Sequence, residues 1–125
     1  MRDHTKLRAF QLADELAVMV YRATSGFPRV EQFGLVAQMR RAAVSVASNI
    51  VEGCARHTEG DYLHFLDVAF GSLRELEYQA ILAHKLGYVQ KNVADPLFAG
   101  CTATSKVLAA LIRSLRQGHP TAERP

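Results

Sequence analysis

Acidic and histidine side chains at helical spacing are the first candidates for chemistry in this chain. Di-metal sites in helical bundles need two Glu-x-x-His pairs and two further glutamates that point inward. The chain offers one near match, Asp61-x-x-His64, and neither Glu75 nor Glu77 is followed by a histidine three positions on. We therefore expect no metal site, and interpret Asp61 and His64 as exposed residues in the first turn of a helix.

Nucleophilic catalysis needs a serine or cysteine beside an oriented base. Ser45, Ser48 and Ser72 have no histidine at helical contact spacing. Cys54 and His57 lie three positions apart, and we interpret them as residues of a helix end and not as a reactive pair. The glycines are scattered singly, so no glycine-rich phosphate loop is present. We predict a non-enzymatic protein without catalytic residues, cofactor or small-molecule substrate.

A varied polar stripe runs along the segment from Gln38 to Glu52. At about 100° per residue, its members fall on one arc of a helix, opposite an arc of mostly small apolar residues. The stripe mixes a cation, an anion, hydroxyls and an amide. Two interpretations stay open: a hydrogen-bond network between helices, for example between Arg41 and Glu75, or a groove that binds a partner. The candidate stripe residues in this segment are Gln38, Arg41, Ser45, Asn49 and Glu52. Glu75, on the third predicted helix, is counted with them as the candidate partner of Arg41.

Basic residues are spread along the chain but would meet at one end of an antiparallel bundle. In such a bundle the first and third helices start at the end where the fourth helix stops. The candidate nucleic-acid contacts at this end are Lys6, Arg8, Arg56, Arg113 and Arg116. Oligomerisation would multiply this patch into a ring that attracts polyanions. A merely solvated surface is the alternative interpretation.

The composition is that of one soluble globular domain. The 125 residues are 49% hydrophobic and 22% charged, with a formal net charge of +3. This mildly basic balance permits contact with nucleic acid without requiring it. No apolar run reaches the roughly 18 residues of a membrane span, and the charged N-terminus lacks a signal-peptide core. We predict a cytoplasmic protein without a membrane partner, in which Cys54 and Cys101 are free thiols.

Apolar residues recur at helical spacing through most of the chain, and strand-like alternation is absent. The periodicity predicts helices over residues 6–24, from 30 or 31 to 54, from 58 to 86, and from a start between 92 and 95 to 118. Gly26 and Gly87 are expected to end helices in the left-handed conformation, and Thr58 to cap the third helix. Short connections predict an all-α, antiparallel up-down-up-down four-helix bundle over residues 1–118, followed by a disordered tail over 119–125.

The chain carries more apolar residues than the core of a monomeric bundle needs, which bears on whether it forms oligomers. The segment 6–24 carries two adjacent apolar seams, one more than a helix needs to pack into a monomeric bundle. Phe65 and Phe70 likewise lie off the main seam of the third predicted helix. This surplus favours a contact between subunits, so we expect a homo-oligomer, with a deeply buried first helix as the alternative.

Three motifs are specific enough to suggest a family. Q-x-R-R-A-x-x-S-x-x-x-N-I-x-E-G spans residues 38–53, F-L-x-x-A-x-G-S-x-x-E-L-E spans 65–77, and L-G-Y spans 86–88. With Phe27-Pro28 and Glu31-x-x-Gly34-Leu35, they extend over nearly the whole chain. The chain strongly resembles a bacterial family of four-helix-bundle proteins first noted as open reading frames in intervening sequences of large-subunit ribosomal RNA genes.

The resemblance implies a four-helix bundle that assembles into a ring-like homopentamer. The family is also similar to the accessory variability proteins of diversity-generating retroelements, which are basic barrels that bind nucleic acid beside a reverse transcriptase. Because the family has no agreed catalytic residues, none are carried over to this chain. We therefore expect a homo-oligomeric accessory protein that binds RNA or DNA. The alternative is a protein interaction scaffold that uses the polar stripe.

Overall fold

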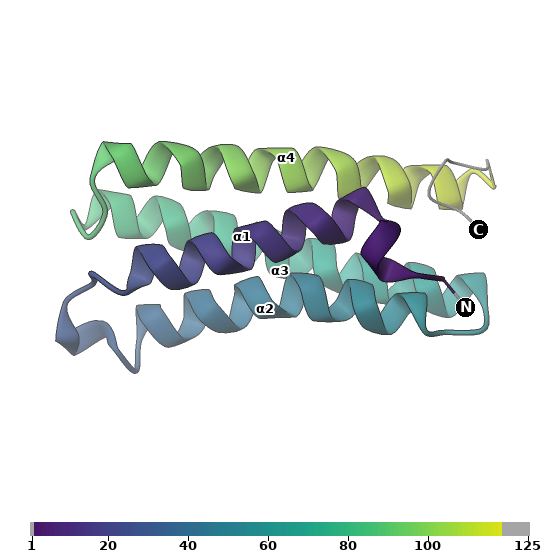
Figure 1. The fold of residues 1–125 in the computed structure, drawn as a ribbon, viewed down its shortest axis with the longest axis horizontal. Coiled ribbons are helices and arrows are strands. Elements are labelled where there is room, and N and C mark those ends of the chain that lie inside the picture. The colour runs from purple at the N-terminus through teal and green to yellow at the C-terminus, as the bar shows by residue number, and fades with distance from the viewer. Residues whose placement is uncertain (1, 119–125) are drawn as a thin grey trace.

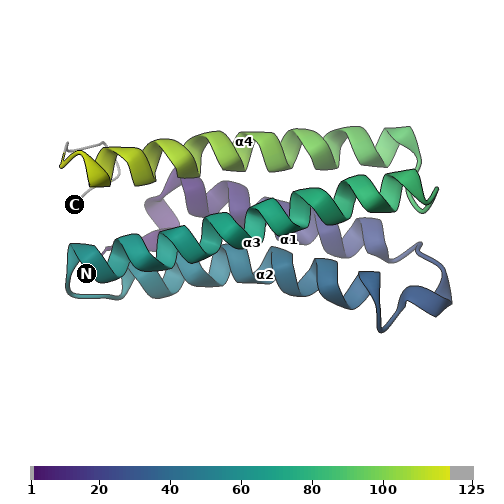
Figure 2. The ribbon, with the colours of Figure 1, turned by 180° about the vertical axis from the view of Figure 1, so that it is seen from behind.

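Four long helices form an antiparallel bundle in the computed structural model, which describes residues 2–118. They are α1 (Arg8–Thr24), α2 (Leu35–Cys54), α3 (Glu59–Lys85) and α4 (Lys91–Arg116), with 3-10 turns η1 (His4–Lys6) and η2 (Arg29–Glu31). Both α1 and α3 pack against α2 and α4, so the cross-section is a square (Figures 1 and 2). The predicted all-α, up-down-up-down bundle is confirmed, and the predicted tail lies outside the described residues.

The core forms where the apolar seams of the helices meet. Every member of the predicted α3 seam up to the helix end is at most 1% exposed: Tyr62, Leu66, Ala69, Leu73, Leu76, Ala80 and Ala83. Because these residues repeat at alternating steps of three and four, they face one direction along the whole helix. The contact between α2 and α3 is the most extensive one between helices. There, a Cβ added to Gly53 would lie 3.0 Å from Cβ of Phe65.

The predicted start of the second helix at residue 30 or 31 is wrong. Residues Arg29–Glu31 form the separate turn η2, and α2 begins at Leu35. Gly34 interrupts the helix with φ −106° and ψ −109°, and a Cβ there would lie 2.8 Å from Oε1 of Glu31. That same oxygen accepts a hydrogen bond from the Leu35 backbone N–H at 3.1 Å. Glu31 therefore caps α2 from outside and does not belong to its first turn.

Other helix ends follow the predicted chemistry in part. Thr58 caps α3, because its Oγ1 accepts the backbone N–H three residues on at 3.1 Å. Gly87 has the predicted left-handed conformation, with φ 79°. The same prediction for Gly26 is wrong, since α1 ends on Ser25 in a right-handed conformation. The fourth helix also starts earlier than predicted, at Lys91.

The close approach at Gly53 gives the first testable prediction. Gly53→Ala should lower the free energy of unfolding by about 1–3 kcal/mol, because the new methyl group meets Tyr62 and Phe65. The control is Gly71→Ala in α3, where an added Cβ has nothing within 4 Å. That variant should gain up to about 1 kcal/mol from helix propensity. Urea unfolding measures both changes, and a shift in the same direction for both variants would contradict the packing described here.

Candidate functional site

The first candidates for chemistry are the acidic, histidine and cysteine side chains. Within residues 2–118, no group of three or more histidine, cysteine, aspartate or glutamate side chains could hold a metal ion. Asp61 and His64 are exposed near the start of α3. Burial raises the pKa of the Cys54 thiol and raises that of Cys101 to about 12, so both thiols stay protonated. In the same part of the chain, no helix combines the length and apolar character needed to cross a membrane.

The inner edge of the polar stripe joins α2 to α3. The hydroxyl oxygens of Ser45 and Ser72 lie 2.8 Å apart. The amide of Asn49 donates to the backbone oxygen of Ser45 at 2.8 Å and to its hydroxyl at 3.0 Å. All three side chains are partly buried. This part of the stripe is therefore a hydrogen-bond network between helices, one of the two interpretations that the sequence left open.

The outer edge of the stripe has a different character. Gln38, Arg41 and Glu75 are exposed, and Arg41 and Glu75 form no ion pair with any residue from 2 to 118. The contact between Arg41 and Glu75 that the sequence suggested is therefore absent, because both side chains lie on solvent-facing sides of their helices. Glu52 is exposed too and pairs with Arg56 at 3.4 Å. The stripe divides into a structural inner half and an accessible outer half.

The five predicted nucleic-acid contacts gather at one end of the bundle, as expected. The start of α1, the turn from α2 to α3 and the end of α4 meet there, on the right in Figure 1, and we name it the α2–α3 end. Several of these cations, Arg8 among them, are engaged within the chain. Arg56 pairs with Glu52 and lies 4.7 Å over the ring of Phe65, and Arg116 pairs with Asp67.

Lys6 and Arg113 remain available at this end. Both are exposed, and neither takes part in an ion pair with another described residue. Arg113 and Arg116 line a cleft of about 390 Å³ between α3 and α4. Phe70 and Ile112 give this cleft an apolar floor. Sequence reasoning did not assign Phe70 to the site, although its position off the main α3 seam was a usable signal.

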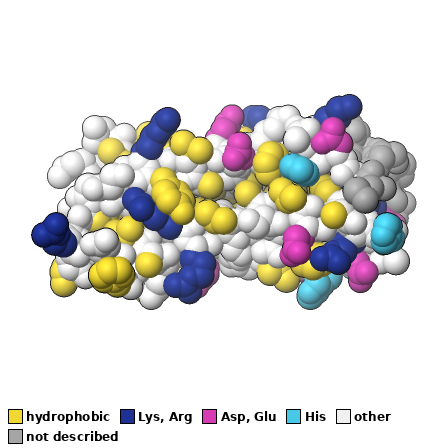
Figure 3. Space-filling model, turned by 60° about the horizontal axis from the view of Figure 1, so that its bottom comes forward, with side chains coloured by type: hydrophobic (Ala, Val, Ile, Leu, Met, Phe, Trp, Pro, Cys, Tyr) yellow, Lys and Arg dark blue, Asp and Glu magenta, His cyan; other side chains and the backbone are white. Residues whose placement is uncertain are grey.

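The opposite end, formed by residues 25–34 and 86–90, was not singled out from the sequence. Figure 3 shows Lys and Arg among hydrophobic side chains toward this end, on the left, and a mixture with Asp, Glu and His toward the right. The loop here is held in place by Tyr88, whose hydroxyl donates to Oε2 of Glu31 at 2.8 Å. The ring of Phe27 packs on Tyr88, with centroids 5.4 Å apart. We name this end of the bundle, formed by residues 25–34 and 86–90, the α1–α2 end.

The chain is therefore a small antiparallel helical bundle in which polar side chains join α2 to α3. The family model described as 23S rRNA-intervening sequence protein matches residues 5–110, and the chain belongs to this family. No curated protein matches significantly.

One solved structure shows the shared fold. It is a crystal structure of a protein of unknown function from the S23 ribosomal protein family of Bacteroides thetaiotaomicron. The two chains are 21% identical, with a TM-score of 0.75. The match covers 84% of this chain and 98% of the other, so the bundle is common to nearly all of that protein.

The Ser45–Ser72 contact predicts an energetic coupling across the seam. Ser72→Ala should cost about 1 kcal/mol of stability, because it leaves the Ser45 hydroxyl without its partner on α3. A double-mutant cycle with Ser45→Ala should give a coupling of about 0.5–1.5 kcal/mol in urea unfolding. Ser48→Ala, at an exposed position of α2, is the control and should change stability by less than about 0.5 kcal/mol. Purely additive effects of the two serine changes would show that the hydroxyls do not interact.

The Tyr88–Glu31 contact predicts a pH-dependent loss of stability. The hydrogen bond to the carboxylate raises the pKa of Tyr88 above its usual value near 10. The folded state thus favours the neutral phenol, and the stabilisation is present below pH 10 and lost as the pH rises through the raised pKa. Tyr88→Phe should lower the melting temperature at pH 8, and the difference from wild type should shrink above pH 10. Tyr78→Phe, at an exposed position, is the control; a difference for Tyr88→Phe that is constant from pH 8 to 11 would rule out this linkage.

Proposed function

We propose that this protein is a non-enzymatic, homo-oligomeric bundle that binds single-stranded nucleic acid at its α2–α3 end. The observation that carries the proposal is the cleft in which Arg113 and Arg116 flank Phe70 and Ile112. Single-stranded nucleic acids bind where cations meet the phosphates and an aromatic ring is available to stack with a base. The family description refers to an intervening sequence of 23S rRNA, so RNA is the first ligand to test.

The cations of the cleft have separate tasks in this proposal. Asp67 holds the guanidinium of Arg116 in one position, whereas Arg113 forms no ion pair with any residue from 2 to 118 and can bind a phosphate. Lys6, Arg8 and Arg56 extend the positive surface around the same end. The net charge of +3 adds a weak general attraction for polyanions.

Assembly would strengthen a weak individual site. In a ring, each subunit contributes one copy of the cleft, and a single strand that touches several copies binds with the combined affinity. A homopentamer is the state that we propose, in line with the resemblance to ring-forming bundles and to retroelement accessory proteins. The role that follows is accessory: the protein would hold RNA or DNA in the cytoplasm for another factor.

The accessible outer half of the polar stripe supports a second candidate function, a scaffold that binds another protein. Arg41 and Glu75 are exposed and form no ion pair within the described residues, and Val44 and Val68 are 42% and 40% exposed on the same two helices. Charged and apolar groups in this mixture suit a protein interface. Partner binding that persists at high salt, and is lost with Arg41→Ala but not with Arg113→Glu, would favour this candidate.

Anisotropy of a labelled, mixed-sequence single-stranded RNA tests the first candidate. Wild type should bind at low salt, with log Kd rising linearly with log salt concentration. Lys6→Glu and Arg113→Glu should each weaken binding, and each should lower the salt slope by about 0.7 if the cation contacts one phosphate. Arg116 is kept, because its reversal would leave Asp67 facing a second carboxylate.

Lys85→Glu is the matched control for this experiment. It makes the same charge change at an exposed position near the α1–α2 end and should leave the affinity within about twofold of wild type. Circular dichroism checks that all variants remain folded. No binding by wild type at low salt, or an equal loss in all three variants, would refute binding at the α2–α3 end.

A further inference from the structure

Two large apolar side chains stand almost free in solvent on the loop between α1 and α2. Val30 is 85% exposed and Phe33 is 91% exposed, the highest values among the large apolar residues described. Burial of such side chains is favourable, so a monomer forgoes a considerable gain at this loop. We name Val30 and Phe33 together the knob.

The knob is held firmly although it is exposed. Glu31, which lies between its two members, accepts the N–H of Leu35 and the hydroxyl of Tyr88. A backbone hydrogen bond from Gly34 to Glu31, at 3.0 Å, closes the loop immediately after the knob. A binding element that is already ordered loses little conformational entropy on contact. These bonds therefore prepare the knob for a partner.

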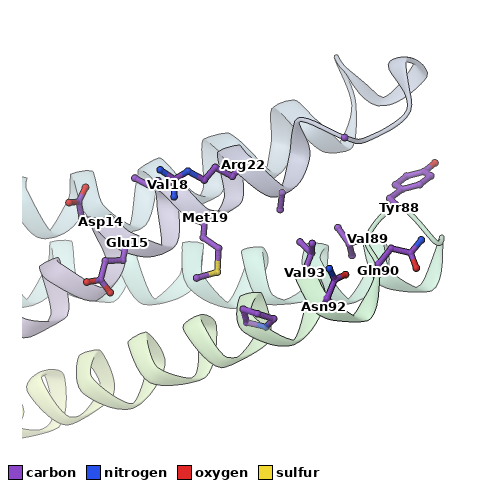
Figure 4. A pocket seen from close by; sticks show the side chains of 13 residues that line it. Asp14, Glu15, Val18, Met19, Arg22, Tyr88, Val89, Gln90, Asn92 and Val93 are labelled. Carbon is purple, nitrogen blue, oxygen red and sulfur yellow. The ribbon is translucent and has the colours of Figure 1, made fainter.

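A groove of suitable size lies between α1 and the beginning of α4. Its volume is about 720 Å³, within the range of about 300–1,000 Å³ that is usual for binding cavities. Figure 4 shows Met19 and Glu15 reaching from α1 toward α4 across this space. Its apolar lining comprises Val18, Met19, Ala23, Val89, Val93 and Pro96.

The charges around the knob and the groove are complementary. Arg29 precedes the knob directly and is exposed, while the neighbouring carboxylate of Glu31 is occupied by its two hydrogen bonds. Asp14 and Glu15 line the groove, against one cation, Arg22. Opposite charges at the rim of an apolar contact favour one orientation of the partners and speed their association.

We propose that the knob of one copy of this chain docks into the α1–α4 groove of a second copy. Neither Val30 nor Phe33 lines the groove of its own chain, so the contact needs two molecules. It is heterologous, since different surfaces meet, and each added copy presents another free knob and another free groove. This proposal supplies the contact for the homo-oligomer of the proposed function and rests on it in that respect.

The knob suits a protein groove better than a nucleic acid. A base can stack on the ring of Phe33, but the aliphatic side chain of Val30 has no π face to offer. An apolar groove buries both side chains together. Binding of RNA at the knob is therefore treated as an outcome that the experiment can reveal.

Light-scattering mass over a range of concentrations tests the contact. Wild type should exceed the 13.8 kDa of one chain, and Phe33→Asp should raise the dissociation constant roughly 30-fold or more, as expected for a central anchor. Val18→Asp, which places a charge in the groove at a position that is 45% exposed, should do the same. Leu86→Asp is the matched control, because Leu86 is 50% exposed at the same end but belongs to neither surface.

Mixing the two defective variants tests whether the contact is heterologous. Phe33→Asp retains a good groove and Val18→Asp retains a good knob, so an equal mixture should form pairs of two chains and grow no further. A charge exchange tests the register: Arg29→Glu should weaken assembly, and Glu15→Arg in the same chain should restore it.

Each remaining outcome decides against the contact. A monomeric wild type overturns it, and so does a Phe33→Asp variant with the mass of wild type. Loss of RNA binding by Phe33→Asp at unchanged mass would assign the knob to nucleic acid and also overturns it. The RNA measurement separates the two proposals: a monomer that binds RNA removes the docking contact and the oligomer but leaves the nucleic-acid site, and an assembled protein that ignores RNA removes only the nucleic-acid site.

Discussion

The close contact between α2 and α3 is the constraint on which the rest of the structure depends. Gly53 lets the end of α2 approach Tyr62 and Phe65 so closely that no side chain would fit between them. The resulting turn places Arg56 over Phe65, and the N-terminal segment closes over the same region, with the Arg2 guanidinium 3.9 Å from the Tyr62 ring centroid. Helices α1 and α4 complete the square, and each of them packs against one helix of this pair.

The two ends of this rod differ in how their charges are used. At the α2–α3 end, cations alternate with carboxylates, and only some of them are left for a ligand, beside the Phe70 cleft. At the α1–α2 end, cations lie among exposed apolar side chains, and the loop is ordered by partly buried hydrogen bonds. Since the two ends are separated by the length of the helices (Figure 1), the proposed ligand binding at one end and the proposed self-association at the other would not compete for space.

Sequence periodicity was sufficient for the fold, because the α3 seam and the Thr58 cap depend on residues close in the chain. It failed at Gly34, because the cap on α2 involves Glu31 held by Tyr88, which is 57 residues away. The Phe70 cleft depended on the register of α3 against α4, which no local pattern reports. The exposure of Phe33 was not predicted for a simpler reason. A second helix that begins at residue 30 leaves no loop on which Phe33 could lie.

Tyr88 contributes both to the α1–α4 groove and to the loop between α1 and α2. Tyr88 is one of the residues that line the α1–α4 groove, and its hydroxyl holds the loop that carries Val30 and Phe33. Filling the groove would restrict Tyr88 and thereby steady the loop of the same subunit that carries Val30 and Phe33. A chain whose groove is occupied would then bind the next chain more tightly through its own knob. Assembly would therefore be cooperative, with few intermediates between the monomer and the closed ring.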